Sequence, residues 1–454
     1  MEKGISRDEG LDICRRMIAT GQIDFLNIIR GHIEHDGPLS RVIPVTGMAS
    51  APHLDFAGQV RTETKFPVFH AARITDVATA RHAVAEGKLD MVGMTRAHIA
   101  DPHIASKVAE GREDHVRPCV GATYCLDRIY EGRATTCIHN AATGREATMP
   151  HTIPRTSGEQ RHVVVVGAGP AGLEAARLSA ERGHRVTLLE AAPDAGGQIR
   201  LAAQVKRRSE LIGIVDWRIA QLQRLGVEVR YNTYAESGDV TALDPDVVII
   251  ATGGLPREDA IAEGGDLATS SWDVISGEAS VGEDVLMYDD NGAHPGMAAT
   301  ETIVARGAKL EVVSPERMFA PEIGGLNLVP YIEKLQGHGA VITTMTRVHS
   351  LKREGNKIAA MLTSPYNEAS VGERLVDQVV VEYATAPMDE LYFALKPDSS
   401  NGGEIDYEAL VAGQSQRVVR NEAGRFQLFR IGDAVAARNI HAAIYDALRL
   451  CKDL

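Results

Sequence analysis

The sequence is short of the features that mark secreted, membrane-embedded and disulfide-stabilised proteins. It holds five cysteines in 454 residues, too few for a disulfide framework. No apolar run approaches the ~18 residues that a membrane span needs. The opening stretch MEKGISRDEGLD lacks the charged and apolar regions of a secretion signal. We therefore expect a cytoplasmic protein with reduced thiols and no membrane span.

Basic residues are also scarce relative to acidic ones. The chain has 48 Lys and Arg against 61 Asp and Glu, a net charge of -13. Nucleic acid is bound mainly through basic contacts to phosphate, so we expect no nucleic-acid partner. The charge suits an enzyme of small molecules or an acidic redox partner. The length of the chain, with 44% hydrophobic and 24% charged residues, predicts two or three domains with sizeable cores. We also expect the protein to form an oligomer.

Residues 1–110 alternate helical patterns with short apolar stretches at 23–31, 66–74 and 89–97. This rhythm predicts parallel strands joined by crossover helices. A candidate pair of binding residues follows each of two of these strands: Ala72 and Arg73 after one, Thr95 and Arg96 after the next. Backbone amides and a guanidinium at strand ends suit a phosphate dianion. Alone, such arginines are more often surface ion-pair partners.

Three of the cysteines cluster in RPCVGATYCLDRIYEGRATTCIHN, residues 117–140. Cys119, Cys125 and Cys137 have the spacing C-x5-C-x11-C, with Ala122 midway between the first two. An iron–sulfur cluster normally needs four thiolates. Three could hold a three-iron cluster, or a four-iron cluster whose odd iron takes another ligand. The alternative is a structural loop with buried free thiols.

After a linker at 149–161, residues 162–191 predict a strand, a tight glycine turn, a helix and a strand. The turn, GAGPAG at 167–172, contains the candidate binding residues Gly167, Gly169, Pro170, Ala171 and Gly172. Its first glycine makes the turn, its second lets the backbone approach a pyrophosphate, and its third permits close helix packing. Glu190, at the end of the next strand, is placed to accept hydrogen bonds from ribose hydroxyls. We expect a bound adenine dinucleotide; the alternative is a turn that serves packing alone.

Three later stretches bear on which dinucleotide binds: GGQ with Gly197 and Gln198, ATGG with Thr252 and Gly253, and RIGDA with Gly432 and Asp433. This arrangement resembles the flavoprotein disulfide reductases, in which such segments close over FAD. The resemblance implies FAD, or ADP in its place, with Asp433 at the ribityl or pyrophosphate part. Asp433 could also cap the final helix.

A second strand-turn-helix-strand unit at 284–316 departs from the dinucleotide pattern. Its turn, DDNGAHPGM, places Gly292 and Gly296 four apart and two carboxylates, Asp289 and Asp290, where a pyrophosphate would approach. Carboxylates repel phosphate, so we expect a retained fold that does not bind NAD(P)H.

The whole chain resembles the trimethylamine dehydrogenase, dimethylamine dehydrogenase and 2,4-dienoyl-CoA reductase family. In that family FHAARI and DMVGMTRAHIADP are similar to the last two strands of an old-yellow-enzyme-type barrel, with Ala72, Arg73, Thr95 and Arg96 at FMN-phosphate positions. Cys119, Cys125 and Cys137 match the first, third and fourth cluster ligands, and Ala122 occupies the second place. The cysteine segment is especially similar to bacterial demethylases of dimethylglycine, stachydrine or N-methylproline.

The resemblance implies an α/β chain in five parts: the last strands of a partial (β/α)8 barrel at 1–112, a cysteine segment and linker at 113–160, a Rossmann-like FAD domain at 161–275, a second Rossmann-like domain at 276–395, and the rest of the FAD domain at 396–454. A full barrel takes eight strands and about 200–250 residues. We therefore expect an N-terminally truncated chain with an incomplete FMN site, and no catalytic residue can be named.

The implied activity is oxidative N-demethylation of a small methylated amine or amino-acid betaine. Hydride would pass from the N-methyl carbon to FMN, and the iminium would hydrolyse to formaldehyde. Electrons would continue through the cluster and FAD to an electron-transfer flavoprotein, a ferredoxin or a dedicated redox subunit. The alternatives are an NAD(P)H-dependent enoate or 2,4-dienoyl-CoA reductase, and a non-catalytic electron-transfer subunit or inactive fragment.

Overall fold

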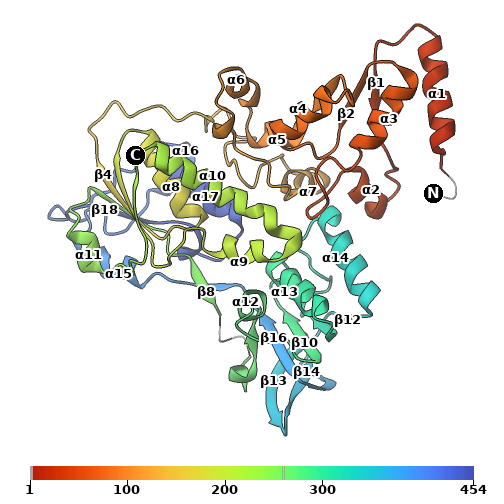
Figure 1. Cartoon of the computed structure of the whole chain (residues 1–454). Helices are drawn as coiled ribbons and strands as arrows, with labels where there is room; N and C mark the ends of the chain where they lie inside the picture. Colours follow the sequence, from red (N-terminus) through yellow and green to blue (C-terminus); the bar gives the residue numbers. More distant parts are fainter. Residues whose placement is uncertain (1–3, 258, 260) are drawn as a thin grey trace.

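The computed structural model describes residues 4–257, 259 and 261–454. Figure 1 shows three bodies, one built around β1 and β2, one around β4 and β18, and one around β10 and β16. The cysteine segment with α7 (Tyr124–Tyr130) lies between the first body and the other two. Within the described residues, no helix is long and apolar enough to cross a membrane.

The first body contains the predicted parallel strands, β1 (Leu26–Ile28), β2 (Val68–Ala71) and β3 (Met91–Gly93), in that order. Leu26, Val68 and Leu89 form its core with residues of the surrounding helices. Asp76 caps α4 (Val77–Ala85) by accepting from the Thr79 amide at 2.7 Å, which explains why the predicted helix begins there. Its helices are α1 (Arg7–Ala19), α2 (Asp36–Val42), α3 (Leu54–Thr64), α4 (Val77–Ala85), α5 (Thr95–Ala100) and α6 (Ile104–Ala109).

The second body is a five-stranded parallel sheet in the order β18-β7-β4-β5-β6. Its central strand, β4 (His162–Val166), is buried throughout, as expected of a parallel strand covered on both faces. The other strands are β5 (Arg185–Leu189), β6 (Glu228–Arg230), β7 (Val247–Ile250) and β18 (Gln427–Arg430). The associated helices are α8 (Pro170–Glu181), α9 (Gln198–Gln204), η2 (Lys206–Ile212), α10 (Gly213–Arg224), α11 (Ser237–Thr241), α15 (Glu390–Leu395), η4 (Lys396–Asp398), α16 (Tyr407–Ala412), η5 (Gly432–Ala434) and α17 (Ile440–Cys451).

The third body is a parallel sheet in the order β12-β11-β10-β16-β9, covered by an antiparallel meander, β13-β14-β15. The strands are β9 (Thr269–Ser270), β10 (Asp284–Asp289), β11 (Lys309–Val313), β12 (Val341–Thr343), β13 (Arg347–Glu354), β14 (Lys357–Thr363), β15 (Ser370–Val376) and β16 (Gln378–Glu382). The helices are η3 (Gly265–Leu267), α12 (Ser271–Ser276), α13 (His294–Ala305) and α14 (Gly325–His338).

The second and third bodies are connected by an antiparallel pair, β8 (Gly254–Pro256) and β17 (Thr385–Pro387). Since β9 pairs with β16, and α15 packs against β18, both limits of the third body lie somewhat earlier than the expected 276–395.

The cysteine segment also contains η1 (Glu113–His115), and residues 131–161 form neither helix nor strand. The linker at 149–161 nevertheless docks firmly, because Met149 and Ile153 are buried in the core of the second body. The linker therefore fixes the cysteine segment against the glycine-turn domain.

Candidate functional site

The glycine turn after β4 has the geometry that a bound pyrophosphate requires. Gly167 has a φ of +99°, and a β-carbon there would lie 2.4 Å from the Ala251 carbonyl oxygen. A β-carbon on Gly172 would lie 1.8 Å from the Gly167 carbonyl oxygen, whereas one on Gly169 would meet nothing within 4 Å. The first and third glycines are thus required for packing, and the second faces open space at the start of α8.

Sheet order brings the other predicted segments to the same edge. β7 lies between β4 and β18, and Ile250 is in register with Val166 and Arg430. The carboxyl ends of parallel strands meet at one edge, so the predicted dinucleotide residues gather there, around the open space beside Gly169 and Gly253 that we call the crevice. They are Gly167, Gly169, Pro170, Ala171, Gly172, Thr252, Gly253, Gly432 and Asp433.

Close backbone approaches hold this crevice together. Gly432, with a φ of +64°, packs so tightly on α8 that a β-carbon would lie 2.9 Å from that of Ala171. The Thr252 hydroxyl donates to the Met388 carbonyl of the returning chain. Gly253 has a φ of +75° and open space around it. The crevice is therefore formed from segments separated by the whole third body.

Asp433 and Gln198 meet across the crevice, where the Gln198 side-chain amide donates to Asp433 Oδ2 at 3.2 Å. Burial raises the pKa of Asp433. Gly197, exposed and with a φ of +50°, approaches the Gly169 backbone, its β-carbon position 3.4 Å from that Cα. Asp433 does not cap the final helix, because it lies within η5, a turn follows, and Asn439 caps α17.

Glu190 is held by the turn itself. Its carboxylate accepts from the backbone amides of Ala168 at 2.6 Å and Ala192 at 2.8 Å. These bonds fix the carboxylate beside the glycine turn, half-exposed. Its contact with ribose stays a prediction, but the residues present fit the adenosine and pyrophosphate part of a dinucleotide.

The turn of the third body is occupied by its own carboxylate. Asp289 is buried, and its Oδ1 accepts from the backbone amides of Asn291 at 3.1 Å and Gly292 at 2.9 Å. A β-carbon on Gly296 would lie 2.5 Å from Asp289 Oδ2. Burial raises the pKa of Asp289 to about 7, and the neighbouring Glu382 is also buried with a raised pKa. Two amides of this turn are thus already paired with its own side chain, and the expectation that no NAD(P)H binds there stays a prediction.

The predicted FMN-phosphate residues lie at the ends of two adjacent strands, Ala72 and Arg73 after β2 and Thr95 and Arg96 after β3. The Arg73 side chain is buried and pairs with Glu210 of η2 at 2.6 Å. Arg96 donates to the Pro44 carbonyl at 2.9 Å. Both guanidiniums are thus engaged by the protein itself, and the contacts of Ala72, Arg73, Thr95 and Arg96 with a phosphate stay a prediction.

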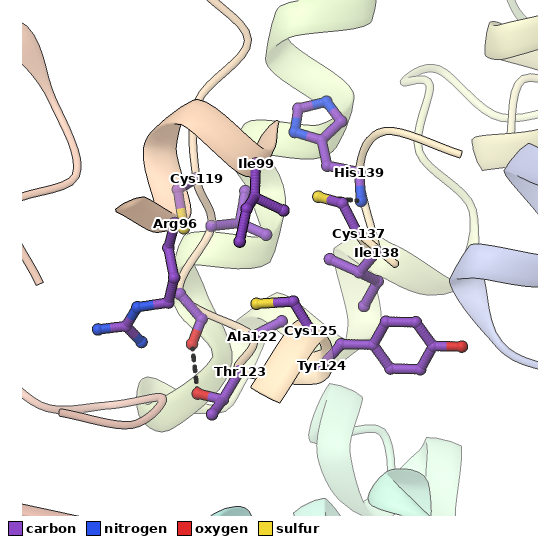
Figure 2. Close-up of a pocket in the computed structure, with 12 residues that line it drawn as sticks. Arg96, Ile99, Cys119, Ala122, Thr123, Tyr124, Cys125, Cys137, Ile138 and His139 are labelled. Atoms are coloured by element: carbon purple, nitrogen blue, oxygen red, sulfur yellow. Dashed lines mark hydrogen bonds between the residues drawn. The ribbon is translucent and has the colours of Figure 1, made fainter. Parts of the chain in front are cut away.

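The three clustered cysteines line one small cavity of about 20 Å³ together with Arg96, Ala122 and Tyr124. Figure 2 shows Cys119, Cys125 and Cys137 reaching this space from three separate stretches of backbone. Gly121 and Thr123, on either side of Ala122, both have left-handed backbone conformations. Burial raises the pKa of Cys125 to about 12, and those of Cys119 and Cys137 are also raised by burial. The thiols are therefore neutral as arranged.

The cavity does not fit a cluster as the side chains lie. Its volume suits about one water molecule. Across residues 4–257, 259 and 261–454, His, Cys, Asp and Glu form no group of three or more that could hold a metal ion. His139 donates to the Pro118 carbonyl at 3.0 Å and packs edge-on against Trp217. Cys119, Cys125 and Cys137 as iron ligands stay a prediction.

A buried charge network beside the cysteines was missed from the sequence. Glu174 accepts from Arg177 at 2.7 Å and from Arg218 at 2.8 Å, and Arg218 also donates to the His139 carbonyl. Burial alone would raise the pKa of Glu174, but the two guanidiniums hold it far below its usual range. The guanidinium carbon of Arg117 lies over the Trp217 ring, 4.4 Å from the ring centroid. Only the i, i+3 spacing of Glu174 and Arg177 could have indicated this network.

The sequence matches two protein families. Residues 40–115 match the NADH:flavin oxidoreductase / NADH oxidase family, and residues 109–283 match the pyridine nucleotide-disulphide oxidoreductases. These matches indicate flavin binding of the FMN type and of the FAD/NAD type.

Curated relatives and a solved structure match nearly the whole chain. The chain is 57% identical over 451 residues to a probable N-methylproline demethylase of Rhizobium meliloti, covering 99% of this chain and 66% of the relative. It is 42% identical over 463 residues to an N,N-dimethylglycine/sarcosine dehydrogenase of Chromohalobacter salexigens, with the same coverage of 99% and 66%. The structure of a 2-naphthoyl-CoA reductase matches with a TM-score of 0.84 and 25% identity, covering 100% of this chain and 64% of that one.

The chain thus spans about two thirds of the length of the relatives that it matches. Over that length the partial barrel and both Rossmann-like domains are present in the family's order. The chain belongs to the trimethylamine dehydrogenase / 2,4-dienoyl-CoA reductase family, in which an old-yellow-enzyme-type barrel is fused to FAD- and NAD(P)-type domains.

Proposed function

We propose that the chain is part of a flavin-dependent oxidoreductase that removes N-methyl groups oxidatively from a small methylated amine or amino-acid betaine. Electrons leave through an FAD-type site to an external protein acceptor. The observation that carries the proposal is the crevice around Gly169, where four segments meet at one sheet edge with open space. The 57% identity to a probable N-methylproline demethylase supports the substrate class.

The third body supports the direction of electron flow. Asp289 satisfies the amides of its own turn, and Asp290 and Glu382 add carboxyl groups beside it. Phosphate would have to displace a hydrogen-bonded side chain and approach acidic groups. A domain that does not take NAD(P)H cannot supply reducing equivalents, so the amine is the electron donor.

The chain's own residues prepare the crevice for its cofactor. Glu190 is oriented toward the turn, and the positive end of α8 faces the space beside Gly169. Asp433 and Gln198 close the opposite side. When bound, a flavin supplies the two-electron chemistry of amine oxidation and its release as single electrons. We derive no step through an iron–sulfur cluster.

A second candidate is reduction of an enoate or acyl-CoA thioester by NAD(P)H. It is favoured by the structural match to a 2-naphthoyl-CoA reductase. It would require a nicotinamide nucleotide to reach the flavin by another route than the turn around Asp289.

Anaerobic titrations of the purified enzyme of which this chain is part, loaded with FAD and FMN and analysed for iron, distinguish the candidates. The proposal expects flavin bleaching and formaldehyde with N-methylproline or dimethylglycine, and no bleaching with NADPH. Bleaching by NADPH alone would favour the second candidate. Flavin binding without reduction by either donor would favour a non-catalytic electron-transfer subunit.

A further inference from the structure

A buried side chain of the third body, Asn327, is hydrogen-bonded to the cysteine loop. Asn327, in the first turn of α14, is 3% exposed. Its amide nitrogen donates to the Ala122 carbonyl at 3.1 Å and to Asp127 Oδ2 at 2.7 Å. Ala122 lies between Cys119 and Cys125, and Asp127 lies on α7, which Cys125 shares. One amide group thus ties two points of the loop to a helix some 200 residues away in sequence.

The surrounding packing leaves little freedom at this contact. A β-carbon on Gly324 would lie 2.2 Å from Asp127 Cγ, so the start of α14 presses directly on that side chain. Leu326 packs in a small apolar cluster with Leu39 and Val45 of the first body. The exposed pair of Arg41 and Glu333, at 2.6 Å, links α2 and α14 farther along the helix.

The loop needs such support because its backbone is strained. Thr123 has a φ of +64°, a conformation that non-glycine residues rarely adopt, and Gly121 has a φ of +63°. Thr46 and Thr123 donate to the Gly121 carbonyl at 2.8 and 3.1 Å, which holds one side of Ala122. Asn327 provides a side-chain donor to the Ala122 carbonyl itself. Strained backbone persists only where its surroundings determine it.

We propose that Asn327 is a positioning residue. Through it the third body holds residues 119–127 in the conformation in which the side chains of Cys119, Cys125 and Cys137 line one cavity. The third body thereby acts as a clamp on the cysteine loop. This role depends neither on the substrate nor on a bound metal.

Peptide-resolved alkylation of the folded chain by iodoacetamide tests the proposal. Buried neutral thiols react only when their surroundings open. Asn327→Ala leaves the Ala122 carbonyl and Asp127 without their donor, so alkylation of Cys119 and Cys125 should rise about tenfold. Cys451, buried in the core of the second body, is the internal reference and should keep its rate.

Two further variants separate positioning from general destabilisation. Asn327→Asp keeps the shape but removes both donors and faces Asp127 with a second carboxyl group, so it should raise the same two rates. Glu333→Ala loses the exposed α2–α14 pair, contacts no residue of the loop, and should leave all rates unchanged. Unchanged Cys119 and Cys125 rates in both Asn327 variants, or a parallel rise at Cys451, would overturn the proposal.

Discussion

The carbonyl oxygen of Gly167 lies 1.8 Å from the place that a β-carbon on Gly172 would take. No side chain can be accommodated there without moving β4 or α8. Three positions earlier, a β-carbon on Gly169 would meet nothing within 4 Å. Two glycines of one turn are therefore needed for different reasons: Gly172 for the packing of helix on strand, and Gly169 for the access of a ligand.

Gly172→Ala should destabilise the chain, because overpacking against backbone forces the helix away from the strand. We expect the free energy of unfolding to fall by about 3 kcal/mol, measured by urea denaturation. Gly169→Ala is the matched control, and its unfolding curve should overlay that of the wild type. Its effect should be loss of FAD binding, measured by flavin content. Full flavin retention in Gly169→Ala would contradict the placement of the cofactor.

Asp289 should make the chain less stable as the pH rises. Burial raises its pKa to about 7 from 3.8, so the folded state holds the proton more tightly than the unfolded state. This contribution is complete below about pH 4 and is lost as the pH approaches 7, with a slope of about 1.4 kcal/mol per pH unit. Asp289→Asn keeps an oxygen acceptor for the Asn291 and Gly292 amides but cannot ionise.

Urea unfolding at pH 5 and pH 7 measures the Asp289 effect. The wild type should lose more stability between the two values than Asp289→Asn. Part of the slope should remain in the variant, because the pKa of Glu382 is raised in the same direction. Parallel curves for the two proteins would show that Asp289 is ionised throughout.

Glu174 should show the opposite pH dependence. Arg177 and Arg218 hold its pKa far below the usual range, so its stabilisation is present above about pH 4.5 and is lost on acidification. Glu174→Gln removes the carboxylate that pairs with two buried guanidiniums, which should lower the free energy of unfolding at pH 7 by about 3–5 kcal/mol. Thermal unfolding at pH 7 and pH 3 measures this, because Glu174 stays ionised in the folded state at pH 4 and most of its stabilisation is still present there. An equal loss at both values would argue against ionic pairing.

Ala122→Cys tests whether the cysteine segment retains a cluster socket. Four thiolates are the usual ligand set, so anaerobic reconstitution should bring the variant to about four irons per chain, and the wild type to fewer. Iron analysis with an absorption spectrum measures this. The Asn327 contact should survive, since it uses the Ala122 backbone carbonyl. Equal iron in both proteins would mean that position 122 does not face a bound metal.

The fold could be predicted because each sequence pattern that defines it spans only a few neighbouring residues. The valines of β4, the glycine spacing and the final helix each constrain their own few residues, and the parallel sheets were expected from them. Contacts between distant segments leave no such pattern. Arg73 fits a phosphate position by sequence, but Glu210, 137 residues away, pairs with it. Asn327 shows no motif, and its two partners are about 200 residues away in the chain.

The cap role of Asp433 failed for a local reason. RIGDA predicts a helix soon after it, but Asp433 itself lies in η5, and a further turn precedes Asn439, which caps α17. Asp433 is thereby left free to face Gln198 across the crevice.

The insertion of the third body between β7 and β18 also sets an order of events during synthesis. β7 leaves the ribosome early, but its neighbour β18 follows only after the entire third body has been made. Until then β7 has an unpaired edge, and the crevice lacks Gly432 and Asp433. A cofactor can therefore be enclosed only after translation has passed the third body, so tight flavin retention is a marker that both Rossmann-like domains were completed.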